Sequence, residues 1–456
     1  MPMDLGKTID SRSAEWQKAL DMAQGNILKS HGRDYSAFLL VEFRPHLNPR
    51  AQLGKLGLDW ITTASQQAAQ TQKYLKQVES GTCPEPELFA NLFLSVWGYL
   101  GLGFTPCELS RAFPHPQNDF RAIVEPSLTN WFLHGMAYHG PHLSDPPRLW
   151  WEPQYQGRVD ALLLLACNDR ATLDLAVGEA RRQIEEFGCV RHIEHGKTHR
   201  VNDTTLEPFG FADGISQPAF LGAGPLADPE IVFCQDRLAA TEHAFGSYLV
   251  YRKLEQNVKL FQEEEERLAN LLGLKGSDRD RAGAMIVGRF RDGSPIIKTD
   301  RPGWQPALDD NFDYSGDPKG MQCPLHSHIR KVRQRPDGKP RLVRRGVPYG
   351  SYDPTDAKMA RPHKGSGLLF LSFQSNIQAQ FGSLQQDWAN DPDFEAPNVG
   401  KDPIAGQGFS SSAQEWPLTW GKAGTSPCQL RSFVTMKGGE FFFTPSRPFF
   451  ERLASE

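Results

Sequence analysis

Three well-separated segments of this 456-residue chain contain residue types that could do chemistry together. The first is GFADGISQP (Gly210–Pro218), a glycine-rich segment with one acid, Asp213. The others are CPLHSHIRK (Cys323–Lys331) and RRGVPYG (Arg344–Gly350). Together they supply a carboxylate that can carry a proton, a histidine that can ligate a metal, and an arginine that can stabilise negative charge. Taken alone, the first segment is better explained as an ordinary Asp-Gly turn.

Five segments together resemble the dye-decolourising peroxidases, a family of haem b enzymes, and in particular its longer, QGNIL-containing subfamilies. They are QGNIL (24–28), GFADG (210–214), the histidine and arginine segments above, and GLLF (367–370). The similarity extends from about Ala23 to Phe450. It implies a peroxidase that uses hydrogen peroxide to oxidise aromatic donors such as dyes and phenols. The reaction would pass through an oxyferryl intermediate on one haem b (iron protoporphyrin IX) per chain.

Two histidines, His326 and His328, compete as the iron ligand within CPLHSHIRK. The resemblance places the ligand directly before the Ile-Arg pair, which selects His328 and leaves His326 as the alternative. A carboxylate that accepts the Nδ1–H of the ligand would make the imidazole more basic. Asp402, in KDPIAG, resembles the family residue in this role, although an aspartate before proline is also typical of a turn.

On the opposite face of the haem, the resemblance assigns Asp213 to proton transfer and Arg344 to stabilisation of the departing hydroxide. Arg344 is selected over Arg345 by its spacing, five residues before the aromatic residue of PYG, and on a strand the two side chains would point apart. A guanidinium beside Asp213 would lower the pKa of that carboxyl and keep it ionised. Leu368 and Phe370 alternate on one strand and share a face, and they resemble the apolar residues that line the distal pocket of the family.

Bulky donors could not enter a closed apolar pocket that admits peroxide. They would instead lose electrons at the protein surface, through a tyrosine or a tryptophan. Tyr349 resembles a surface tyrosine that some relatives use in this way, and Trp388, Trp416 and Trp420 are further candidates.

Composition excludes several other classes of protein. A formal net charge of −4 gives no basic surface for a nucleic acid. The N-terminal MPMDLGKTIDSRS lacks the pattern of a secretory signal, and the uncharged run Leu88–Cys107, broken by glycines and a proline, predicts buried core and not a membrane span. Seven cysteines without a CxxC pair predict reduced thiols and no zinc site. We therefore expect a cytoplasmic protein without membrane or nucleic-acid partners, either a monomer or a homo-oligomer.

Short apolar runs alternate with amphipathic stretches along the whole chain. Strands are predicted at 37–43, 160–166, 247–251, 367–373 and 440–444, and helices at 171–187 and 257–274. The order predicts an α+β fold of two ferredoxin-like domains with antiparallel sheets and surrounding helices, as in the dimeric α+β barrel-like superfamily. The domains would be 1–205 and 206–456, the second binding haem. Pro- and Gly-rich stretches at 291–320 and 391–424 are expected to be long loops.

The function predicted is therefore that of a haem b peroxidase. A haem-binding protein for transport or iron release, with only incidental peroxidase activity, would need the same fold and His328 but no acid beside an arginine. A haem-free interaction module would leave His328 and its partners unexplained.

Overall fold

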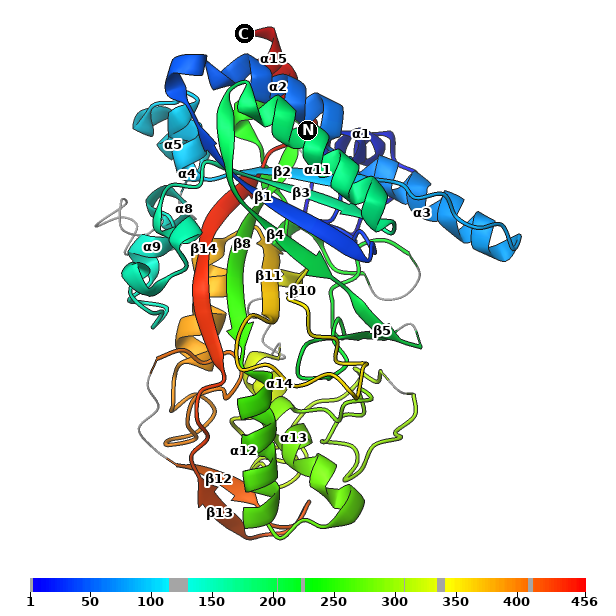
Figure 1. Cartoon of the computed structure of the whole chain (residues 1–456), viewed down its shortest axis with the longest axis vertical. Helices are drawn as coiled ribbons and strands as arrows, with labels where there is room; N and C mark the ends of the chain where they lie inside the picture. The colour runs from blue at the N-terminus through cyan, green and yellow to red at the C-terminus, as the bar shows by residue number, and fades with distance from the viewer. Residues whose placement is uncertain are drawn as a thin grey trace.

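An antiparallel sheet that closes on itself forms the centre of the molecule (Figure 1). The computed structural model describes residues 3–114, 130–202, 204–222, 226–306, 308–333, 341–408 and 413–456. The closed sheet consists of β1 (Tyr35–Phe43), β2 (Phe89–Leu94), β3 (Ala161–Cys167), β4 (Gly188–Lys197), β8 (Phe245–Gln256), β10 (Val347–Tyr349), β11 (Gly367–Gln374) and β14 (Val434–Thr444). These strands pair in the order β8–β14–β2–β3–β1–β4–β10–β11, and β11 pairs back onto β8.

The two halves of the chain contribute four strands each, in the same relative order. The N-terminal half has the order β2–β3–β1–β4. The C-terminal half has the corresponding order β10–β11–β8–β14. In each half the first and third strands lie side by side in a ferredoxin-like antiparallel arrangement. The halves join where Phe443 of β14 pairs with Leu94 of β2 and where Tyr349 of β10 pairs with Gly196 of β4. The predicted α+β class is confirmed.

Apolar sequence explains the position of the central strands. Every residue of β3 (ALLLLAC) is buried, as is every residue of β2 (FANLFL), because side chains on both faces of these strands contact other elements. All residues of the five predicted strands except Asp160 lie within observed strands, and Asp160 lies one residue before β3. Each observed strand extends beyond the predicted range at one or both ends. The short β7 (Cys234–Gln235) and β9 (Val343–Arg344) pair with β8 and β11 beside the closed sheet.

Helices cover the two ends of this sheet (Figure 1). At one end, with both chain termini, lie α1 (Ala14–Met22), α2 (Pro49–Trp60), α3 (Ala64–Glu79), α11 (Arg170–Glu185) and α15 (Arg447–Ser455). At the other end lie α12 (Val258–Leu271), α13 (Asp280–Val287), α14 (His328–Val332) and the hairpin of β12 (Gln414–Pro417) and β13 (Thr425–Cys428). The predicted helices correspond to α11 and α12, and the side chain of Asn257 caps α12 by accepting a hydrogen bond from the Leu260 N–H at 2.9 Å.

The uncharged run Leu88–Cys107 forms β2, α4 (Val96–Gly101) and the start of α5 (Pro106–Ala112). Within the described ranges, none of the helices has the length and apolar character needed to cross a membrane. The loop prediction for 391–424 was partly wrong, because Gln414–Pro417 pairs with β13. The β5 (His199–Val201) and β6 (Thr204–Leu206) hairpin follows β4 and leads directly into the GFADG segment.

Candidate active site

A cavity of about 690 Å³ lies between the C-terminal half of the sheet and the end of the molecule that holds α13 and α14. All its lining residues fall between Glu207 and Val434. They come from the GFADG loop, β8, α14, β9, β11 and the segments around residues 381–389 and 404–407. Small-molecule and cofactor sites usually enclose about 300–1,000 Å³, so this cavity is large enough for a sizeable organic cofactor.

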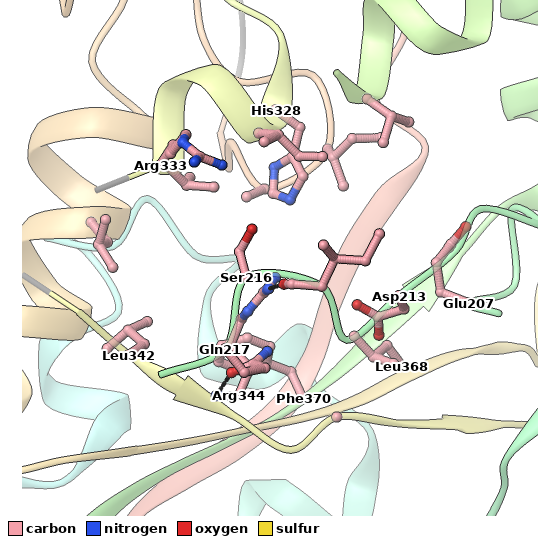
Figure 2. A pocket seen from close by; sticks show the side chains of 18 of the residues that line it. Glu207, Asp213, Ser216, Gln217, His328, Arg333, Leu342, Arg344, Leu368 and Phe370 are labelled. Carbon is pink, nitrogen blue, oxygen red and sulfur yellow. Dashed lines mark hydrogen bonds between the residues drawn. The ribbon is translucent and has the colours of Figure 1, made fainter. Parts of the chain in front are cut away.

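His328 begins α14, and its ring faces the cavity from one side (Figure 2). Its Nδ1 lies 2.8 Å from Oδ2 of the fully buried Asp402. The other Asp402 oxygen accepts the N–H groups of Ile404 and Ala405 at 2.8 and 2.9 Å. Burial acts to raise the pKa of Asp402, but the charge and hydrogen bond of His328 and the two backbone N–H groups outweigh it and hold this pKa below its ordinary value. The pair therefore fixes the ring so that Nε2 remains to ligate a metal.

The competing histidine, His326, lies elsewhere. It is 2% exposed, packs its ring 4.3 Å from that of Trp416, and does not line the cavity. Burial lowers its pKa to about 3, so the ring is neutral. Among the described lining residues His328 is the single histidine, and none is a cysteine or a methionine. The donor set thus fits the axial ligation of a haem iron by His328 alone.

Asp213 lies across the cavity from His328, at the end of a tight loop (Figure 2). The flanking Gly210 and Gly214 have φ of +88° and +80°, a conformation that glycine adopts without strain. The Asp213 N–H donates to the Thr205 carbonyl at 2.8 Å, and the Thr205 hydroxyl donates to the Asp213 carbonyl at 2.9 Å. The backbone on both sides of Asp213 is therefore held to β6, and its half-buried carboxylate faces the cavity.

Arg344 lines the same side of the cavity as Asp213 (Figure 2). Its guanidinium donates to the Ile215 carbonyl at 2.9 Å, and its backbone N–H donates to Oε1 of Gln217 at 3.0 Å. In the described parts of the chain no hydrogen bond or ion pair joins Arg344 to Asp213 directly. We expected the two side chains to pair directly. Instead, Asp213 belongs to the loop, and Arg344 donates to the Ile215 carbonyl two residues further along the same loop.

Arg345 points away from the cavity, as the strand alternation predicted. Its guanidinium donates to the carbonyls of Asn26 at 2.8 Å and Ile27 at 3.2 Å, both in the QGNIL segment. Burial and the neighbouring Arg344 charge lower its pKa to about 10. Arg345 thus ties the N-terminal segment to the sheet, and the QGNIL sequence has a structural contact of its own.

Leu368 and Phe370 both line the cavity from β11, whereas Leu369 and Leu371 between and after them are fully buried on the opposite face. Figure 2 shows both apolar side chains on the wall opposite His328. On the periphery, Arg333 and Arg341 provide cations that could hold the carboxylates of a porphyrin.

Several polar residues of the cavity were not anticipated from the sequence, and three of them make hydrogen bonds beside Asp213 and Arg344. Glu207 and Gln256 line it and hydrogen-bond each other at 2.7 Å, and Gln217 orients the backbone of Arg344. Glu207 stands only three residues before Gly210, so its place next to the motif was the available signal. Gln217 lies within the GFADGISQP segment, which was its available signal. Gln256 gave none, because its partner lies more than forty residues away in the chain.

The prediction of a surface tyrosine at position 349 is wrong. Tyr349 is 7% exposed, because β10 is flanked by β4 and β11, and its hydroxyl has no hydrogen-bond partner among the described residues. Trp388 and Trp416 are also buried, and Trp420 is partly buried and donates to the Ile296 carbonyl at 2.8 Å.

Comparisons of the sequence and of the structure with known proteins identify one and the same family. Residues 207–398 match the family described as "Dyp-type peroxidase, C-terminal". The chain is 36% identical to the multifunctional dye peroxidase DyP2 of Amycolatopsis sp., covering 99% of this chain and 100% of the relative, and 32% identical to the dye-decolorizing peroxidase AauDyP1 of Auricularia auricula-judae, covering 80% and 75%. The crystal structure of the DyP-type peroxidase of Anabaena sp. superposes with a TM-score of 0.87 at 35% identity over 99% of both chains. The chain belongs to the DyP-type peroxidases, a haem-dependent enzyme family.

Proposed function

We propose that the cavity binds one haem b, which Nε2 of His328 would hold through its iron while Asp402 accepts the Nδ1–H of the ring. The bound haem would supply the redox chemistry of the reaction. The support is the donor set: the one lining histidine among the described residues faces the cavity and is oriented by a buried carboxylate. That carboxylate makes the imidazole a stronger donor, which lowers the potential of the metal.

On the other side, Asp213 would accept the proton of hydrogen peroxide and return it to the leaving oxygen. Arg344 would stabilise the negative charge that develops on that oxygen, because its guanidinium is fixed in place by the Ile215 carbonyl. Leu368 and Phe370 would exclude water from this wall and leave room for peroxide. Each group would act without moving the backbone, since the loop is closed by hydrogen bonds to β6.

The reducing substrates would be aromatic donors, including dyes, as the names of the relatives state for those proteins. Small phenols could reach the edge of the haem, whereas bulky dyes would be oxidised at the surface. Trp150, which is 74% exposed, is the better surface candidate than the buried Tyr349. Replacing Trp150 with Phe should reduce dye turnover and spare phenol oxidation, and Tyr349→Phe serves as the control.

Four broader assignments accompany this proposal. Residues 206–456 would form the haem-binding domain and residues 1–205 the other domain. All seven cysteines are free thiols, which suits a reducing compartment such as the cytoplasm. The formal charge of −4 gives no reason to expect a nucleic-acid partner, and the chain would act as a monomer or a homo-oligomer.

The observation that carries the proposal is the placement of the His328–Asp402 pair on one side of a single cavity and of Asp213 and Arg344 on the other (Figure 2). The test is haem reconstitution followed by stopped-flow reaction with hydrogen peroxide. Asp213→Asn should retain haem and slow the peroxide reaction by about 100-fold or more, the usual contribution of general acid–base catalysis. Parental rates in Asp213→Asn and Arg344→Leu would leave a haem-binding protein with incidental activity as the better description.

A further inference from the structure

A second carboxyl group, that of Glu207, lines the cavity on the side of Asp213 (Figure 2). Its Oε1 accepts the Phe211 N–H at 2.9 Å, and its Oε2 accepts both the Phe209 N–H at 2.9 Å and the Gln256 amide at 2.7 Å. The backbone N–H of Glu207 also donates to the Phe211 carbonyl at 3.1 Å. Glu207 thus closes the loop Glu207–Phe211, which Ala212 and Asp213 follow directly in the chain.

This carboxyl has no cationic partner in the described residues. Arg291, the nearest guanidinium in charge interaction with it, is engaged by both oxygens of Glu265 at 2.8 and 2.7 Å. The other titratable groups that interact with Glu207 are Asp213, whose negative charge disfavours a second carboxylate, and Tyr352. Burial is the main reason that the pKa of Glu207 is raised to about 7, while the three hydrogen bonds oppose this shift. A half-buried acid that lines a cavity and has no ion-pair partner among the described residues is a frequent mark of a functional group.

The partner of Glu207, the amide of Gln256, can accept a hydrogen bond as readily as it donates one. Oε1 of Gln256 is buried and has no hydrogen-bond partner among the described residues. A carboxylate accepts the amide N–H of Gln256, as observed. A protonated Glu207 could instead donate its O–H to Oε1, once the amide has turned over about its terminal bond, because the two ends of the amide have nearly the same shape. The Phe211 N–H bond to the opposite oxygen is compatible with both states.

We propose that Glu207 is a positioning residue for Asp213: it fixes the catalytic loop and, with Gln256 as a two-way partner, gains or loses a proton inside the cavity. This inference rests on the proposed function, since it gives Asp213 its role. Its consequence is electrostatic. Ionised Glu207 adds a negative charge to the wall of the cavity that also holds Asp213 and Arg344, whereas neutral Glu207 does not.

The test compares Glu207→Gln with the parent protein. Infrared difference spectra between pH 5 and pH 9, recorded on haem-free protein, should contain a carboxyl group that titrates near pH 7 in the parent and is missing from Glu207→Gln. With haem bound, fluoride affinity is measured from the Soret band. The ratio of the Glu207→Gln affinity to the parental affinity should be close to one at about pH 5 and rise to on the order of 10-fold at about pH 9, because two unit charges within one cavity repel each other at an effective dielectric constant of about 20.

Glu440→Gln is the matched control. Glu440 is buried and, like Glu207, accepts two backbone N–H groups, here from Met136 and Phe441, but it does not line the cavity. Its replacement should leave the fluoride ratio flat. Should Glu207→Gln fail to fold, Gln256→Met decides the matter, because loss of the amide donor should move the Glu207 titration to higher pH.

An unchanged fluoride ratio in Glu207→Gln, or an unmoved titration in Gln256→Met, would overturn the proposal. Failure of the proposed function is a separate outcome. If the parent did not take up haem or react with peroxide, the infrared titration of the haem-free protein would still decide the protonation of Glu207.

Discussion

Replacement of Asp402 by Asn should weaken haem binding while leaving the fold intact. The carboxylate makes three hydrogen bonds, one from His328 and two from backbone N–H groups. An amide cannot serve all three, because one of its two ends is a donor. If the amide nitrogen faced His328, Nδ1 would have to accept, and the ring proton would move to Nε2, the atom that should bind iron. If the nitrogen faced Ile404 and Ala405 instead, two backbone donors would meet a third donor.

The size of the effect follows from the bond that is lost. A hydrogen bond to a charged group contributes about 1.5–3 kcal/mol, and replacement of such a supporting ligand partner typically lowers metal affinity by about 10- to 100-fold. We expect a loss of haem affinity in this range. The Fe(III)/Fe(II) potential should also rise, because the imidazole becomes a weaker donor. Transfer of haem to an excess of acceptor apoprotein measures the first effect, and spectroelectrochemistry measures the second.

The control is Asp236→Asn. Asp236 is also buried, and it accepts the N–H and hydroxyl of Ser446 at 2.8 and 2.7 Å, but it does not line the cavity. This variant should lose stability and keep its haem affinity and potential. A parental haem affinity together with a parental potential in Asp402→Asn would refute the proposed role of the His328–Asp402 pair.

Three further predictions rest on the contacts described above. His328→Ala should lose haem or hold it weakly, whereas His326→Ala should keep a normal Soret band, because His326 does not reach the cavity; the reverse result would identify His326 as the ligand. Arg344→Leu should retain stability and slow the peroxide reaction by about 100-fold. Arg345→Leu should remove the guanidinium donor from three backbone carbonyls, and loss of the bond to each of the two buried ones, of Asn26 and Ile27, should lower the free energy of unfolding by about 1–3 kcal/mol. Equal stability of the two variants in urea would contradict this division. Burial lowers the pKa of His139 to about 3, against about 6.5 in an unfolded chain, so this histidine lowers the stability of the fold as the pH falls from about 6.5 towards 3. His139→Phe, which can keep the ring stack on Trp131, should therefore unfold at lower pH than the parent in an acid titration followed by circular dichroism.

The sequence was sufficient for the fold class because local patterns and long-range pairing agree. Continuous apolar runs such as ALLLLAC became strands buried on both faces, and the helical stretch after β8 became α12 with its cap at Asn257. Lining of one cavity by His328, Asp213 and Arg344 was likewise foreseen from the motifs that carry the family resemblance. Their catalytic roles remain predictions.

What escaped prediction depended on contacts between distant residues. Tyr349 was expected at the surface, but its exposure is decided by two neighbouring strands, of which β4 is far away in sequence. The direct pairing of Asp213 with Arg344 was inferred from charge alone, whereas the position of the guanidinium is set by the Ile215 carbonyl. The pairing of Glu207 with Gln256 could not be foreseen, because nothing in either local sequence indicates the other.

The two halves of the chain have the same strand order, yet the cavity belongs to one of them. In the N-terminal half, β2 and β3 are buried on both faces and contribute no lining residue. In the C-terminal half, alternate residues of the paired strands β8 and β11 turn towards the cavity, among them Arg252, Leu254, Leu368 and Phe370. The difference arises because the segment after β8 turns away into α12, α13 and the long loop that leads to α14 (Figure 1). His328, the first residue of α14, therefore lies across the cavity from the sheet (Figure 2). The C-terminal copy of the repeated fold thus forms a site because one face of its sheet lines the cavity, where its side chains can contact a ligand.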